Sequence, residues 1–216
     1  MVIAIDGPAA SGKGTIAQGV AQALGFHYLD SGSLYRLVAL MALNAGIALD
    51  DEARLAHAAE ASAFGFADNA ITLDGLDVTA AVRTEAVSAA SSRVAVLGGV
   101  RRALLSRQRA FRRPPGLVAE GRDMGTVVFP DATLKVYVTA SVEERARRRY
   151  KQLIEKGNSV RLDSLLRDIR DRDARDSSRA VAPLTPAADA IVLDTTDLSI
   201  DAGVAFVLER YRALHP

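Results

Sequence analysis

The sequence contains no cysteine, no tryptophan and only three histidines among its 216 residues. The absence of cysteine excludes disulfide bonds, thiol catalysis and thiolate metal sites. The histidines, His27, His57 and His215, do not have the spacing of metal ligands, so we expect them to be structural.

Long apolar runs and a strong net charge are also missing. No apolar run approaches the roughly 20 residues that a membrane span needs. The apolar start, Val2–Ile5, meets Asp6 and has no basic leader, so we expect a buried strand and not a signal peptide. A net charge of +1 argues against a general polyanion binder. We therefore expect a cytoplasmic protein that binds neither membranes nor nucleic acid.

Lysine is scarce, because only four of the 27 basic residues are lysines and the others are arginines. A genome rich in G and C would produce this bias without any functional cause. Arginine is also the side chain that forks onto carboxylate and phosphate oxygens. The positions of the arginines therefore matter more than their number.

Short β-rich runs alternate with long helical stretches, which predicts an α/β fold with a parallel sheet. We expect a helix from Lys13 to Leu24 that stops at Gly25. A second helix is expected from Ser141, which has the spacing of a capping box with Glu144. The expected core strands are Val2–Asp6, Phe26–Leu29, Leu117–Glu120, Leu134–Thr139 and Ala190–Asp194.

Two segments fit a simple sheet poorly. In Phe64–Val78, turn signals at Asp68-Asn69 and Asp74-Gly75 predict a small antiparallel meander. Charges of both signs crowd Tyr150–Arg179, which fits either a solvated surface helix or a mobile lid over a polyanionic ligand.

The strongest local pattern is a phosphate-binding loop, GPAASGKGT, which directly follows the first strand and leads into a helix. Glycines let backbone N–H groups turn toward phosphate oxygens, and the helix N-terminus adds partial positive charge. Lys13 can reach the β- and γ-phosphates of ATP. The residues expected to bind ATP are Gly7, Pro8, Ala9, Ala10, Ser11, Gly12, Lys13, Gly14 and Thr15.

The loop alone does not distinguish a kinase from other nucleotide-binding proteins. A guanine-reading Asn-Lys-x-Asp motif is absent, which argues against a GTPase. Glu120 could serve as the acid of an ATPase, so that alternative stays open. Three further stretches are LDSGSLYR at 29–36, EGRDMGTVVFPDA at 120–132 and RDRDARDSSRAVAPL at 170–184. If the last stretch begins as a helix, Arg172, Asp176 and Arg179 lie on one face of it.

In this order, the loop and the three stretches closely resemble the bacterial cytidylate kinases, over essentially the whole chain. Gly14, between Lys13 and Thr15, is typical of nucleoside monophosphate kinases. The resemblance implies a five-stranded parallel sheet with a nucleotide-monophosphate-binding insertion and a short lid. It makes residues 1–216 one kinase unit: a core at 1–63, 111–149 and 180–216, an insertion at about 64–110 and a lid at about 150–179.

The resemblance also implies roles for single residues. Arg36 and Arg122 would grip the phosphate of CMP, while Ser31 and Asp123 would help to hold the nucleotide. Ser92, Arg101 and Asp176 would read the cytosine, with Ser91 as an alternative to Ser92. The residues expected to act in catalysis are Lys13, Arg122, Asp123, Arg148, Arg172 and Arg179, the last of which would also contact CMP. Arg149 is an alternative to Arg148.

The activity implied is transfer of the γ-phosphoryl group of ATP to CMP or dCMP, with Mg²⁺ held by Thr15 directly or through water. We expect the enzyme to be a monomer whose partners are these nucleotides. Two alternatives remain: a related kinase for UMP, AMP or shikimate, and a non-catalytic nucleotide sensor or ATPase regulator.

Overall fold

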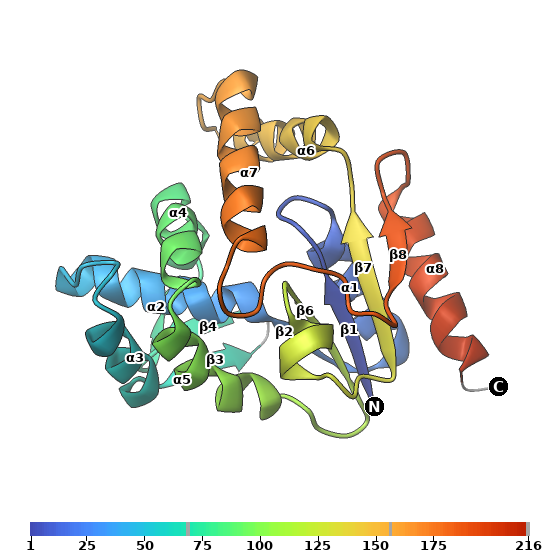
Figure 1. The fold of residues 1–216 in the computed structure, drawn as a ribbon, viewed down its shortest axis with the longest axis horizontal. Coiled ribbons are helices and arrows are strands. Elements are labelled where there is room, and N and C mark those ends of the chain that lie inside the picture. The colour runs from blue at the N-terminus through green and yellow to red at the C-terminus, as the bar shows by residue number, and fades with distance from the viewer. Residues whose placement is uncertain (68–69, 156, 215–216) are drawn as a thin grey trace. The chain divides into compact units, whose positions relative to one another are not determined.

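A computed structural model describes residues 1–67, 70–155 and 157–214. The chain divides into two compact units. The sheet unit comprises Met1–Leu29 and Phe111–Pro216, and the helical unit comprises Asp30–Ala110. Figure 1 labels most of the helices and strands of both. In the described residues, no helix combines the length and the apolar character that crossing a bilayer requires.

A five-stranded parallel sheet, in the order β2-β6-β1-β7-β8, organises the sheet unit and confirms the predicted fold class. Strand β1 lies at its centre, with Ala4 opposite Ala119 of β6 and Lys135 of β7. Strands β1 and β7 have the expected bounds, β6 and β8 differ by one residue at one end, and β2 is shifted by one residue at both ends. The strands are β1 (Val2–Asp6), β2 (His27–Asp30), β6 (Leu117–Gly121), β7 (Leu134–Thr139) and β8 (Ile191–Asp194).

The helices of the sheet unit follow the predicted signals. Helix α1 ends at Gly25, whose φ of 64° is left-handed and suits glycine. Helix α6 begins after Ser141, whose hydroxyl accepts a hydrogen bond from the Glu144 amide at 3.2 Å. These helices are α1 (Lys13–Leu24), α6 (Val142–Glu155), α7 (Leu162–Ser177) and α8 (Ile200–Ala213), with a single π-helical turn η2 (Met124–Val128).

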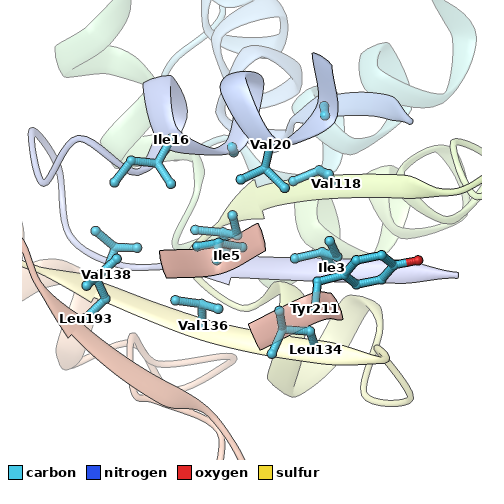
Figure 2. Close-up of a cluster of buried hydrophobic side chains, with 13 residues drawn as sticks. Ile3, Ile5, Ile16, Val20, Val118, Leu134, Val136, Val138, Leu193 and Tyr211 are labelled. Atoms are coloured by element: carbon cyan, nitrogen blue, oxygen red, sulfur yellow. The ribbon is translucent and has the colours of Figure 1, made fainter. Parts of the chain in front are cut away.

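One face of the sheet buries its apolar side chains against α1 and α8 (Figure 2). Ile16 and Val20 of α1 lie over the strands, and Tyr211 comes from α8. The strand β1 is buried along its whole length because neighbouring strands and helices cover it. Its carboxyl end, which carries the phosphate loop, therefore starts from a rigid support.

The helical unit consists mainly of two helix pairs, α2 with α4 and α3 with α5. The predicted meander is present as the antiparallel strands β3, β4 and β5. Asp74 and Gly75 both have positive φ, as the two-residue turn requires. The other expected turn, Asp68-Asn69, lies outside the described residues. The elements are α2 (Ser31–Ala45), α3 (Glu52–Ala61), β3 (Phe64–Ala67), β4 (Ala70–Leu73), β5 (Leu76–Asp77), η1 (Ala81–Arg83), α4 (Glu85–Val94) and α5 (Gly98–Arg109).

Central placement of β1 makes its side chains costly to truncate. We expect Ile5→Ala, at a fully buried position, to lower the free energy of unfolding by about 2–5 kcal/mol. The control Val192→Ala, on β8 at a side chain 58% exposed, should change it by less than about 0.5 kcal/mol. Urea denaturation followed by circular dichroism measures both, and equal losses would contradict the placement.

Candidate phosphoryl-transfer site

The phosphate loop connects β1 to α1 with a backbone that demands glycine at two positions. A Cβ at Gly7 would lie 2.0 Å from the carbonyl oxygen of Val138, which no relaxation of a side chain could relieve. Gly12, with φ of 84°, is the N-cap of α1, and no side chain of the cap bonds the first amides of that helix. The Ser11 hydroxyl is buried and has no hydrogen-bond partner in the described part of the chain. The loop thus presents polar groups of the kind that bind phosphate oxygens.

Lys13 forms an ion pair at the start of α1. Its Nζ lies 3.1 Å from Oε2 of Glu120, and both side chains are largely buried. Glu120 stands near the end of β6, where sequence analysis considered it only as the acid of an ATPase. The ion pair keeps the lysine ordered beside the loop, and it adds Glu120 to the candidate site.

A second cluster of charges surrounds Asp176, whose carboxylate is almost completely buried. Arg122 Nε donates to Asp176 Oδ2 at 2.9 Å, and Arg179 donates to Oδ1. Burial alone would raise the pKa of Asp176, but Arg122, Arg179 and Arg172 outweigh it and hold that pKa below its usual range. Burial lowers the pKa of Arg122, but Asp176, together with Glu120 and Asp6, raises it above its usual value. The cluster stays charged at neutral pH and brings together four of the predicted residues.

Arg179 reaches this cluster by a different route from the one predicted. Helix α7 ends at Ser177, so Arg179 follows the helix and does not lie on its face. The contact with Asp176 survives because the chain turns back there: the Leu184 amide donates to the Asp176 carbonyl at 2.8 Å. The expectation that Arg179 shares a helix face with Arg172 and Asp176 is therefore wrong. Arg179 nevertheless lies close to Asp176, as expected.

Arg148 lies beside the phosphate loop. Its Nη1 is 3.1 Å from Thr195 Oγ1 and would be 3.7 Å from a Cβ at Gly12. Glu144 orients it through an ion pair of 3.0 Å. The alternative residue, Arg149, bonds Gln152 at the exposed face of α6. The geometry therefore favours Arg148.

Arg145 was missed by sequence analysis, although it ties three parts of the sheet unit together. Its guanidinium forms a bidentate pair with Asp173 of α7, at 3.0 and 2.5 Å. It also donates to the carbonyls of Ala9, in the phosphate loop, and Ala140, after β7. Arg145 thus links α7, which carries Arg172 and Asp176, to the loop.

Four more of the predicted residues lie in the helical unit. Ser31 begins α2, whose first turn Asp30 caps by accepting from the Ser33 amide and hydroxyl. Arg36 donates to the Val82 carbonyl at 3.1 Å. These two residues share α2, as their spacing in the sequence requires.

The other two predicted residues of the helical unit are buried. Arg101 donates to the Ala95 carbonyl at 3.1 Å, and its guanidinium carbon lies 5.6 Å from the ring centroid of Tyr35. Both Ser91 and Ser92 are buried on α4. The Ser91 hydroxyl donates to the Ser88 carbonyl, within its own helix.

These features define a P-loop nucleotide-binding protein. The phosphate loop lies at the end of the central strand of a parallel sheet, a lysine stands at the start of the following helix, and arginines cluster nearby. The sequence model of one family in this class, described as cytidylate kinase, matches residues 3–213. The chain belongs to the cytidylate kinase family.

Individual relatives agree with this assignment. The cytidylate kinase of Burkholderia cenocepacia (strain HI2424) is 59% identical over 213 residues, which are 99% of this chain and 93% of that protein. The cytidylate kinase of Paraburkholderia phymatum is 58% identical over 215 residues, 100% of this chain and 94% of that protein. Among solved structures, TT1252 from Thermus thermophilus aligns over 100% of this chain and 98% of its own, with 23% identity and a TM-score of 0.47.

The bidentate pair of Arg145 yields a stability prediction. Arg145→Lys keeps the positive charge but removes the guanidinium that pairs with Asp173 through two hydrogen bonds. We therefore expect the free energy of unfolding to fall by about 1–3 kcal/mol. The control Arg170→Lys changes an exposed pair with Glu143 and should cost less than about 0.5 kcal/mol. Urea denaturation of both variants is the measurement, and equal effects would mean that Arg145 is no more important than a surface arginine.

Proposed function

We propose that this protein transfers the γ-phosphoryl group of ATP to CMP or dCMP, giving ADP and CDP or dCDP. The observation that carries the proposal is membership of the cytidylate kinase family over residues 3–213. The sheet unit supports it chemically, because the phosphate loop and the arginine cluster provide positive charge for a polyanionic reaction.

ATP is proposed to bind along Gly7–Thr15, with loop amides on its phosphates and the Lys13 ammonium on the β- and γ-phosphates. The pair with Glu120 keeps the Lys13 ammonium at the start of α1, next to the loop. Arg148 supplies further positive charge from beside Gly12.

CMP is proposed to bind through its phosphate to Arg36 and Arg122, with Ser31 and Asp123 assisting. Ser92, Arg101 and Asp176 are proposed to read the cytosine. Cytosine presents an amino donor next to acceptors, which matches a carboxylate together with an arginine. Uracil would place a carbonyl against the carboxylate and leave a buried acceptor unpaired, which is costly.

No catalytic base is needed for this transfer. A phosphate oxygen of CMP is ionised at neutral pH, attacks the γ-phosphorus, and ADP leaves as the bond to its oxygen breaks. The protein must hold two polyanions in line and neutralise the charge that spreads over the moving group. Lys13, Arg122, Arg148, Arg172 and Arg179 are proposed to do so. Closure of residues 150–179 would exclude water, which otherwise competes as the acceptor.

Mg²⁺ fits the donor groups at the start of α1. The described residues include no group of three or more His, Cys, Asp and Glu side chains that could hold a metal ion. Mg²⁺ is commonly held by few protein oxygens and by substrate phosphates, so this sparse set suits it. Thr15, exposed in the first turn of α1, would hold the ion directly or through water. When bound, Mg²⁺ offsets negative charge on the β- and γ-phosphates.

The nucleotide-monophosphate-binding insertion at about 64–110 and the lid at about 150–179 stay predictions, as do the monomeric state and the cytoplasmic location. The insertion falls inside the helical unit, which begins earlier, at Asp30.

An acceptor screen tests the proposed function. ADP release from ATP and Mg²⁺ is measured with CMP, dCMP, UMP, AMP and shikimate in turn. We expect CMP and dCMP to be preferred over UMP by about tenfold or more, since the wrong base leaves polar groups unpaired. Equal turnover of UMP would remove the cytosine specificity, and no acceptor-dependent ADP release would leave only a nucleotide sensor or an ATPase.

Asp176→Asn tests how the base is read. The amide can donate to the uracil carbonyl, so we expect the ratio of kcat/KM for CMP to that for UMP to fall about tenfold. The control Asp171→Asn, at an exposed position on the same helix, should leave the ratio unchanged. An unaltered ratio in Asp176→Asn would place base recognition elsewhere.

A further inference from the structure

Asp6 is the last residue of β1 and immediately precedes Gly7, yet none of the proposed roles includes it. Its side chain is buried, with 6% of the residue exposed. Oδ1 accepts a hydrogen bond from the Met124 amide at 2.8 Å, and Oδ2 accepts one from the Gly125 amide at 2.8 Å. One carboxylate therefore joins the start of the phosphate loop to the segment that directly follows Arg122 and Asp123.

The η2 turn explains why a carboxylate is needed. The first amides of a helical turn have no acceptor within the turn. In η2, the Asp123 carbonyl accepts from the Val127 and Val128 amides, while the Met124 and Gly125 amides donate to Asp6. A neutral side chain of the same size, such as an amide, would offer only one acceptor oxygen, whereas Met124 and Gly125 present two N–H donors.

Burial disfavours the ionised form of Asp6. Burial raises the pKa of Asp6 to about 6. The two amides favour the ionised form and lower this pKa, but their effect is smaller than that of burial. Asp123 raises that pKa further, while Arg122 lowers it. Tyr137 faces Asp6 from β7, and Lys135 of the same strand extends its stem near Gly125 and pairs with Asp189. No cation bonds the Asp6 carboxylate in the described part of the chain, so the amides of η2 are its main support.

We propose that Asp6 is a positioning residue for phosphoryl transfer, which fixes Arg122 and Asp123 relative to the first residue of the phosphate loop. The proposal rests on the function proposed above, because it gives Arg122 the acceptor phosphate and the loop the donor. In-line transfer requires donor and acceptor to be held within a fraction of an ångström, and a small misplacement lowers kcat steeply. Asp6 sets that distance through two hydrogen bonds and touches neither nucleotide.

A pH-dependent role follows from the same geometry. Ionised Asp6 accepts from both amides, whereas the protonated acid carries a hydrogen on one oxygen and loses that acceptor. Because the pKa of Asp6 is about 6 in the folded protein, positioning is complete well above pH 6 and is lost as the pH falls through that value. A carboxylate that served stability alone would change the free energy of unfolding with pH and leave the kcat of the folded enzyme unaffected.

Asp6→Asn tests this role, because the amide has the size of the acid but the acceptor capacity of its protonated form. We expect kcat with CMP to fall about tenfold at pH 8, while the KM for ATP changes less than about twofold. The ratio of wild-type to variant kcat should approach one as the pH is lowered from 8 to 5. Titration of the nucleotides affects both enzymes alike and cancels in this ratio.

The control is Asp189→Asn, which neutralises the exposed partner of Lys135 and leaves η2 untouched. Its kcat should equal that of the wild type at every pH. A ratio for Asp6→Asn that does not change with pH, or an undiminished kcat, would overturn the proposal.

Hydrogen exchange in the wild-type protein gives a second test that does not depend on the variant folding or on any activity. After correction for intrinsic rates, the amides of Met124 and Gly125 should lose protection between pH 8 and pH 5, relative to amides at the centre of β1. Constant protection would refute the pH-dependent contact. Loss of protection in a protein that fails to phosphorylate CMP would overturn the proposed function and leave the contact established.

Discussion

Repulsion between cations is the constraint on which the sheet unit depends. A site for two polyanions needs several guanidinium and ammonium groups close together, and these repel one another unless carboxylates lie between them. Asp176 separates Arg122 from Arg179, Glu120 holds Lys13, and Asp173 holds Arg145. Phosphates, like these carboxylates, present anionic oxygens that accept from guanidinium groups, so an arriving nucleotide finds cations that are already ordered.

Most of the sheet could be predicted because its strands are short apolar runs bounded by turn residues, and because its first loop has a distinctive glycine pattern. The meander was also predictable, since Asp74-Gly75 requires a backbone that few other pairs adopt. Each of these features depends on local sequence.

The pairing of charged side chains could not be predicted in the same way. The run 144–150 contains four arginines, and only packing decides that Arg145 faces inward while Arg147 is mostly exposed. No glycine or proline at Ser177 indicates in the sequence that α7 ends there. Arg179 was therefore predicted to lie on this helix, although it follows it. Roles that depend on tertiary contacts, such as those of Asp6 and Glu120, become visible only when distant strands are brought together.

The order of the strands has a consequence for how the protein is made. Strand β1 pairs with β6 and β7, whose first residues are Leu117 and Leu134, so β1 leaves the ribosome long before either of its partner strands. Such distant pairing forms slowly and leaves an apolar strand exposed meanwhile. During that interval the helical unit, which lies between the partners in the sequence, is fully synthesised. The phosphate loop is synthesised before these partner strands, but it is therefore among the last features to acquire its shape.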